Sequence, residues 1–166
     1  MRSSSLPPLH MHRTDRLAYF EVLARKGGSR NALNRYYWKD ITRYCDYFAH
    51  EDISVLEVGS GMGDLLAGIR AKRKVGIDFS PGMIEVAKKR HPELELHVMD
   101  AENITLEGKF DLIIISNLVG FTNDVQRVFE ELRKVCHERT KVIVTYYNSL
   151  WGPLLRFTEM IGRYKP

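Results

Sequence analysis

The sequence has little of several features that would place it in a class at once. Only two of the 166 residues are cysteine, Cys45 and Cys136, which is too few for a disulfide framework or a metal-ligand cluster. No stretch approaches the roughly 18 uninterrupted apolar residues of a membrane span, and the first ten residues lack the apolar run of a secretory signal. We therefore expect a cytoplasmic protein without a membrane span or a bound metal.

Basic residues are unevenly distributed, and no block of consecutive basic residues occurs. The net charge is +4, yet residues 1–50 alone carry +5 and the remaining residues carry −1. A basic segment can meet nucleic acid, anionic lipid or an acidic substrate. Arg and Lys also simply solvate the outer faces of helices, so the charge by itself does not select a partner.

The composition fits one globular domain, because 44% of the residues are hydrophobic and 28% are charged. Residues 1–12 show no periodicity and are expected to form a flexible tail. Residues 13–50 are expected to form an N-terminal helical lid, whose first helix begins with a Thr14 cap and stops at Gly27. An apolar stripe at helical spacing then predicts a second helix; its members are Leu33, Tyr37, Ile41, Tyr44 and Phe48.

Beyond residue 51, short β-branched runs alternate with helical stretches, which is typical of βαβ units and a parallel sheet. The Ser-Pro step at Ser80 predicts a helix N-cap, and Asn123 followed by Gln126 resembles a capping box. Residues 110–116 are almost continuously apolar, as expected for a strand buried on both faces. The expected strands are residues 53–58, 74–78, 93–98, 110–116 and 140–147.

A glycine-rich turn is the strongest local signal. An apolar strand ends at Glu57 and enters a turn with Gly59, Gly61 and Gly63, which is expected to open a helix. Glycines allow positive φ and close approach of a ligand, and a helix N-terminus offers free N–H groups to an anionic group. A dinucleotide site needs G-x-G-x-x-G, but Asp64 stands where its last glycine would be. This spacing disfavours NAD and FAD.

Two further acidic residues follow the ends of the next two strands. Asp78 stands where a carboxylate can accept hydrogen bonds from both ribose hydroxyls. It could instead cap the next helix, but Ser80 already offers that cap. Asp100 ends the third strand and could accept a hydrogen bond from an exocyclic amine. With Glu57, these residues place three carboxylates along one crevice at the carboxyl edge of the sheet.

The ordered motifs resemble those of class I S-adenosylmethionine-dependent methyltransferases, in particular small bacterial-type members. They occupy residues 57–63, 76–83, 100–102 and 110–117, and the resemblance covers roughly residues 31–150. It implies a three-layer, Rossmann-like α/β fold with about five parallel strands in the order 3-2-1-4-5 and N-terminal helices. It also implies that the α/β domain at 51–166 lacks the family's final two strands.

By this resemblance the cofactor is S-adenosylmethionine, and S-adenosylhomocysteine is the product. The methionine end would lie against Glu57 and the glycine turn, the ribose on Asp78 and the sulfonium near Asn117. The adenine would lie against side chains that follow the second and third strands. The implied cofactor-binding residues are Glu57, Gly59, Ser60, Gly61, Gly63, Asp78, Phe79, Met83, Asp100, Ala101 and Asn117.

The acceptor side of the crevice is less defined. Methyl transfer depends mainly on alignment, and a general base is needed only when the acceptor keeps its proton. His97, within a strand, and His137, at a helix end, favour structural roles, so no catalytic residue is assigned. Aromatic side chains at helical spacing are usually core. The candidate acceptor-side residues are Tyr36, Tyr37, Phe121, Tyr146 and Asn148.

Three functions remain open. The ordered motifs favour methylation of a small-molecule or glycan- or lipid-linked acceptor. The basic N-terminal third suggests a nucleic-acid methyltransferase, but residues 116–119 lack the Asn-Pro-Pro-aromatic sequence of base-amino methyltransferases, which disfavours it. A non-catalytic cofactor-binding module is the third. Because an uncovered fifth strand would be an exposed edge, we expect a second copy, the C-terminal helix or further residues to cover it.

Overall fold

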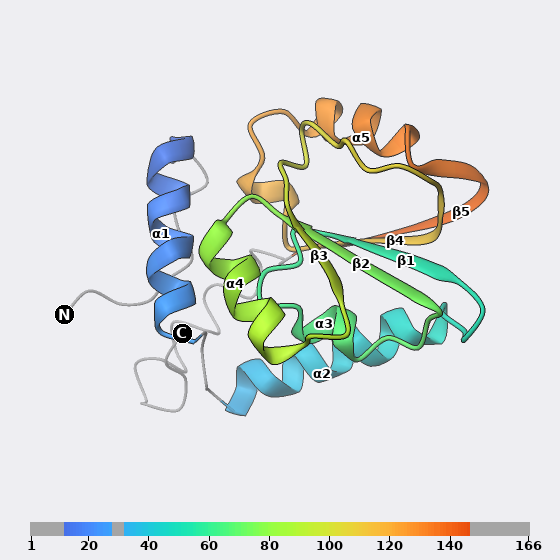
Figure 1. The fold of residues 1–166 in the computed structure, drawn as a ribbon, viewed down its shortest axis with the longest axis horizontal. Coiled ribbons are helices and arrows are strands. Elements are labelled where there is room, and N and C mark those ends of the chain that lie inside the picture. Colours follow the sequence, from blue (N-terminus) through green and yellow to red (C-terminus); the bar gives the residue numbers. More distant parts are fainter. Residues whose placement is uncertain (1–11, 28–31, 147–166) are drawn as a thin grey trace.

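The structure is a computed structural model that describes residues 12–27 and 32–146. Its centre is a sheet of five parallel strands in the order β3-β2-β1-β4-β5 (Figure 1). This arrangement confirms the expected order 3-2-1-4-5. The strands are β1 (Ser54–Val58), β2 (Arg73–Asp78), β3 (Glu95–Val98), β4 (Phe110–Ser116) and β5 (Cys136–Thr145).

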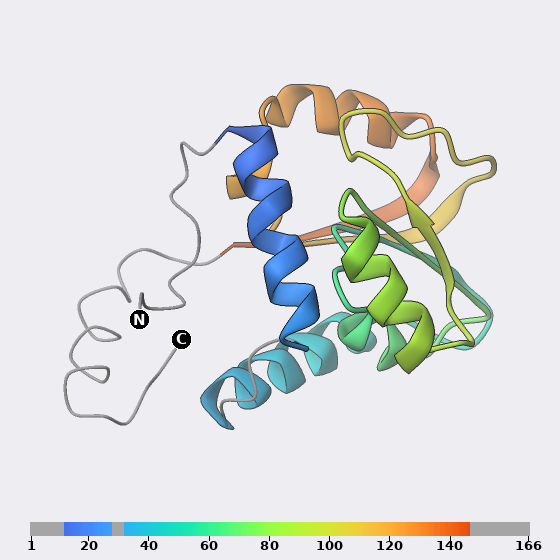
Figure 2. The ribbon, with the colours of Figure 1, turned by 60° about the vertical axis from the view of Figure 1, so that its left-hand side comes forward.

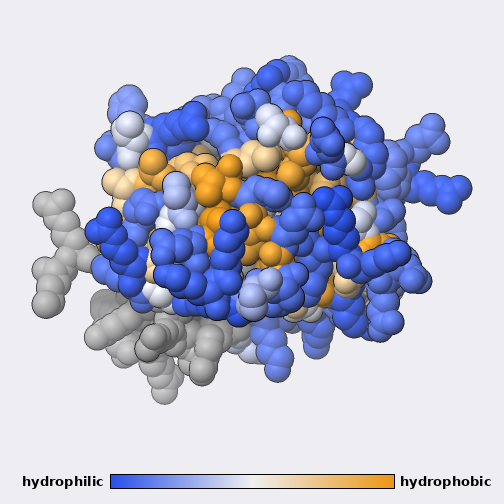
Figure 3. Space-filling view, in the orientation of Figure 1, coloured by the Kyte–Doolittle hydropathy of each residue, from blue (hydrophilic) through white to orange (hydrophobic). Residues whose placement is uncertain are grey.

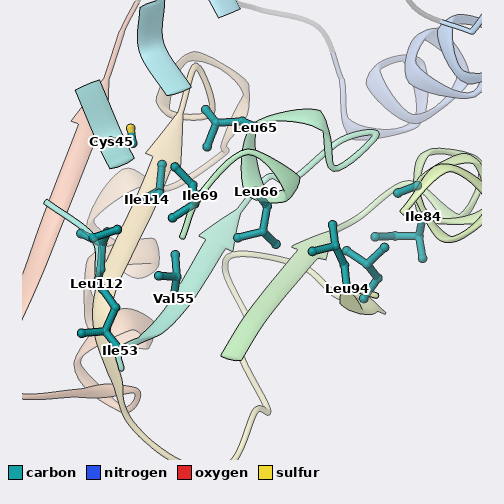
Figure 4. Close-up of a cluster of buried hydrophobic side chains, with 13 residues drawn as sticks. Cys45, Ile53, Val55, Leu65, Leu66, Ile69, Ile84, Leu94, Leu112 and Ile114 are labelled. Carbon is teal, nitrogen blue, oxygen red and sulfur yellow. The ribbon is translucent and has the colours of Figure 1, made fainter. Parts of the chain in front are cut away.

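The central strands are buried on both faces because helices cover both sides of the sheet. On one side, side chains from α2 (Ala32–Tyr47), α3 (Asp64–Ala67) and α4 (Pro81–Arg90) pack against β1 and β4. Cys45, Leu66 and Ile114 meet in this cluster (Figure 4). On the other side, α5 (Val125–Arg133) covers a second cluster. Three layers result, as the resemblance implied.

The first helix, α1 (Arg13–Arg25), takes no part in these layers. It packs against α4 and stands beside the sheet at the edge where the strands end (Figures 1 and 2). The 3-10 helix η1 (Val119–Phe121) follows β4 at the same edge. The carboxyl ends of β1, β2 and β3, the loop after β4 and α1 thus surround one space.

Several local expectations are corrected. The N-cap of α1 is His12 and not Thr14, and the cap of α5 is Asp124, whose carboxylate accepts from the Arg127 N–H. The helix after the glycine turn has only four residues, too short for a substantial helix dipole. Residue 137 lies inside β5 rather than at a helix end. The Ser80 cap is confirmed, since its hydroxyl accepts from the Met83 N–H at 3.2 Å.

The outer surface is mainly hydrophilic in the view of Figure 3, with apolar atoms gathered near the middle, between α4 and α5. Strand β3 forms one edge of the sheet, and its Val98 is 53% exposed. Within residues 12–27 and 32–146, no helix is long and apolar enough to cross a membrane.

Candidate functional site

The glycine turn is held against the end of β2 by backbone hydrogen bonds. The N–H groups of Gly59 and Ser60 both donate to the Ile77 carbonyl, at 2.8 and 2.9 Å. Gly59, Gly61 and Gly63 all have positive φ, between 51° and 80°, which L side chains adopt only with strain. The glycines of the motif therefore set the path of the turn.

Close packing beneath the turn requires one more glycine. A Cβ atom added to Gly76 in β2 would lie 2.9 Å from the Ser60 side chain and 2.7 Å from that of Leu96. No Cβ can stand there without moving its neighbours. By contrast, a Cβ on Gly61 would meet no atom within 4 Å, so open space lies beside the middle of the turn.

Asp78 joins the turn to the beginning of α4. One carboxylate oxygen accepts from the Gly61 N–H and the other from the Ser80 N–H, both at 2.9 Å. The side chain is almost fully buried, and this burial raises its pKa despite the two hydrogen bonds. Each oxygen keeps a second lone pair for a ligand hydroxyl.

Glu57 lies one residue before the end of β1 and is only 2% exposed. Among the described residues, its Oε2 atom has no hydrogen-bond partner, and neither does Oγ of Ser60. Burial raises the pKa of Glu57 well above its ordinary value. Buried polar atoms are nearly always paired, so two orphaned oxygens at one turn indicate a place where a ligand supplies the missing donors.

The third acidic residue, Asp100, begins the loop after β3. One of its oxygens accepts from the Glu102 N–H at 2.9 Å, and the other pairs with Arg13 at 2.6 Å. Asp100 lines a cleft together with Asp78. The other lining residues are Arg13, Arg16, Gly59, Phe79, Met99, Ala101, Glu102, Leu118, Phe121, Thr122 and Asn123.

The sequence predicts a helical lid at residues 13–50, but it does not identify the individual α1 residues that line the cleft. The buried Arg16 donates to the Phe121 carbonyl and to the Asn123 side chain. Phe20 contacts Phe79 and Phe121 edge-to-face, with centroids 5.6 and 5.7 Å apart. The spacing of Arg13, Arg16 and Phe20 at three and four residues could have shown that one helix face carries them.

Asn117 and Tyr37 meet on the acceptor side. Asn117 follows β4 with φ of 53°, and its amide nitrogen lies 3.2 Å from the Tyr37 hydroxyl. The next residue, Leu118, packs so closely on the turn that a Cβ at Gly59 would lie 3.1 Å from it. The structure therefore brings a residue of α2 to the end of β4, beside the glycine turn.

Other expected site residues lie elsewhere. Met83 is buried in α4 and does not line the cleft. Tyr36 is 70% exposed and Tyr146 54% exposed, and neither lines the cleft. Phe121 lies on the Asp100 side of the cleft, against Phe20. Asn148 lies outside the described residues.

A family described as a methyltransferase domain matches residues 55–139. This segment is half of the chain and contains the glycine turn, Asp78, Asp100 and β4. The chain therefore belongs to the methyltransferase domain family, and the resemblance to class I S-adenosylmethionine-dependent methyltransferases is confirmed.

Curated relatives share this segment. A demethylmenaquinone methyltransferase of Thermotoga maritima is 32% identical over 97 residues, which are 54% of this chain and 42% of that protein. A malonyl-[acyl-carrier protein] O-methyltransferase of Priestia megaterium is 32% identical over 93 residues, 52% of this chain and 34% of that protein. The chain spans between 32% and 59% of the length of the curated relatives it matches.

Solved structures share the fold. N-methyltransferase NodS from Bradyrhizobium japonicum, in complex with S-adenosyl-L-homocysteine, has a TM-score of 0.61 and 18% identity, over 70% of this chain and 63% of that one. A putative S-adenosyl-L-methionine-dependent methyltransferase from Methanococcus maripaludis has a TM-score of 0.63 and 17% identity, over 98% and 84%. These likenesses support the Rossmann-like methyltransferase fold.

Proposed function

We propose that this chain binds S-adenosylmethionine in the cleft and transfers its methyl group to a small-molecule acceptor. The observation that carries the proposal is the set of three acidic residues at the ends of adjacent parallel strands, around a turn whose buried Glu57 oxygen has no partner. Family membership supports it, as do the relatives named demethylmenaquinone methyltransferase and malonyl-[acyl-carrier protein] O-methyltransferase.

The residues present fit this cofactor. The orphaned Glu57 oxygen suits the ammonium of the methionine end, and the second lone pairs of Asp78 suit two ribose hydroxyls. Phe79 and Ala101 offer apolar surface for a flat base, and Asp100 offers an acceptor for its amine. When bound, the cofactor supplies an electrophilic methyl group on a sulfonium.

The protein's part in the reaction is binding and alignment. Holding the two reactants in near-attack geometry can supply roughly 7–11 kcal/mol of the acceleration. The Tyr37–Asn117 pair offers a hydroxyl and an amide to orient the acceptor. The exposed Tyr36, together with Phe121, Tyr146 and Asn148, remains a weaker proposal for acceptor contacts.

Contacts of the basic residues favour a small molecule over nucleic acid. Arg13 and Arg16 are engaged inside the cleft, and Arg43 and Arg70 pair with Asp40 and Asp46. These guanidinium groups are therefore paired within the protein and do not form an unpaired basic surface that would bind a phosphate backbone.

Calorimetry with S-adenosylmethionine and S-adenosylhomocysteine tests the proposal. Wild type should bind both, and Asp78→Ala should lose at least about 100-fold in affinity, because two charge-assisted hydrogen bonds are each worth roughly 1.5–3 kcal/mol. Glu95→Ala is the matched control, since Glu95 pairs with Arg73 on the exposed face of β3. Absence of binding by folded wild type, or equal binding by Asp78→Ala, would refute the proposal.

Two weaker proposals concern assembly and location. Among the described residues β5 is an edge strand, and its Val142 and Val144 are 42% and 44% exposed. This exposure supports a second copy covering the edge, which analytical ultracentrifugation tests: a monomer at micromolar concentration would contradict it.

Cys45 and Cys136 are both free thiols, which supports a reducing, cytoplasmic location.

A further inference from the structure

The outer wall of the cleft contains an ion pair at the position where an adenine amine is expected. One oxygen of Asp100 accepts from the Glu102 N–H, and the other is held by the Arg13 guanidinium at 2.6 Å. Arg13 and Asp100 both line the cleft. The guanidinium therefore occupies space beside the carboxylate that a ligand amine would have to enter from the cleft.

The two cleft arginines of α1 differ in their freedom to move. The Arg13 side chain is 62% exposed, so it can turn into solvent without losing packing. Arg16 is 5% exposed and donates both to the Phe121 carbonyl and to Asn123. Withdrawing Arg16 would remove the donor that the partly buried Phe121 carbonyl has in the structure, which is unfavourable.

Other contacts keep α1 on the rim of the cleft independently of Arg13. Glu21 accepts from the Ser80 hydroxyl at 2.7 Å and from the Gly82 N–H at 2.9 Å. Phe20 fills the space between Phe79 and Phe121. The helix can thus stay in place while Arg13 leaves Asp100.

We propose that Arg13 neutralises Asp100 when no ligand is bound and that the adenine amine displaces it on binding, while Arg16 keeps α1 as the outer wall of the site. This inference rests on the proposed function. It makes Arg13 a competitor of the ligand and Arg16 a positioning residue of the cofactor site.

Calorimetry with adenosine and S-adenosylhomocysteine separates these roles. Both probes carry no net charge at neutral pH, so removing one cation does not alter long-range attraction. Arg13→Ala should tighten binding by up to about fivefold, the range expected for an exposed ion pair. Arg43→Ala, which removes an arginine of α2 paired only with Asp40, should leave affinity unchanged. Arg16→Ala should weaken binding at least about tenfold.

A double-mutant cycle locates the effect at Asp100. Asp100→Asn should weaken binding of both probes, and adding Arg13→Ala to it should have no further effect, since the competing pair is already gone. Unchanged or weaker binding by Arg13→Ala would overturn the inference. Tighter binding that persists in the Asp100→Asn background would overturn it too.

Hydrogen exchange without any ligand gives a readout that does not depend on the cofactor. Amides of α1 should stay protected in Arg13→Ala and lose protection in Arg16→Ala. Loss of protection in Arg13→Ala would show that Arg13 is itself an anchor, contrary to the inference. If wild type binds neither probe, the proposed function fails; if it binds both and Arg13→Ala has no effect, only this inference fails.

Discussion

Two glutamates are buried in this domain, and their surroundings are opposite. Glu131 of α5 is 0% exposed, yet its carboxylate is saturated: Lys134 and Arg127 pair with it at 2.6 and 2.7 Å, and the Ile104 N–H donates at 3.0 Å. Glu57 of β1 is 2% exposed, and one of its oxygens has no partner among residues 12–27 and 32–146. Their pKa values move accordingly, lowered for Glu131 and raised for Glu57.

The difference separates a structural carboxylate from one prepared for a ligand. A buried charge is stable only when it is paired and hydrogen-bonded, and Glu131 meets that condition within the protein. It ties α5 to the loop after β3, which carries Asp100 and Ala101. Glu57 meets the condition only in part, which supports the proposal that it accepts a hydrogen bond from the ammonium of the cofactor.

The largest expected effect comes from removing the saturated carboxylate. Glu131→Ala leaves the buried Ile104 N–H without its acceptor and removes the carboxylate that pairs with Lys134 and Arg127, so Tm should fall by several degrees. The matched control is Glu130→Ala, because that neighbour is exposed and pairs only at the surface; its Tm should change little. Equal Tm values for both variants would show that Glu131 has no special structural role.

At Glu57 we expect the opposite effect, an increase in stability on substitution. Because burial raises the folded-state pKa of Glu57, its carboxyl favours the folded state below the unfolded value near 4.5, and this contribution is lost as pH rises through the folded pKa. Glu57→Gln should therefore stabilise the unliganded protein by about 1–2 kcal/mol at pH 8 and less at pH 5.

Calorimetric unfolding at both pH values measures this, and S-adenosylhomocysteine titration provides the second readout. The variant should gain Tm and lose at least about tenfold in affinity, as expected where a site trades stability for function. A variant that is less stable than wild type at pH 8, or that binds as tightly, would show that Glu57 does not await a ligand.

Local sequence signals account for the parts of the fold and of the site that could be predicted. The strands are predictable because short β-branched runs alternate with helical stretches and β4 is almost continuously apolar, and the turn is predictable because three glycines with positive φ admit few other residues. These signals are local. Asp78 and Asp100 could be assigned to one crevice because the carboxyl ends of parallel strands share an edge.

Long-range polar contacts could not be predicted. Glu131 looks like an ordinary surface charge on an amphipathic helix, and only the loop folded over it makes it buried. The sequence predicts that Asn123 caps α5, but the structure gives that role to its neighbour Asp124. The Asn123 side chain instead accepts a hydrogen bond from Arg16, more than a hundred residues away in sequence. Such partners are set by tertiary structure and leave no periodic pattern.

The smallest expected effect concerns a third carboxylate, Glu21, at the surface between α1 and α4. Hydrogen bonds from the Ser80 hydroxyl and the Gly82 N–H lower its pKa, so its contribution is present above the unfolded value near 4.5 and is lost as pH falls through the folded pKa. Because it lies near the surface, the contribution should stay within about 1 kcal/mol. The protection factors of α1 amides, which correct for the intrinsic exchange rate, should therefore fall at acid pH in wild type, while Glu21→Gln should have lower protection factors at neutral pH and respond less to acid. Identical pH profiles for the two proteins would mean that Glu21 does not anchor α1, and that contacts such as those of Arg16 and Phe20 hold the helix on the cleft instead.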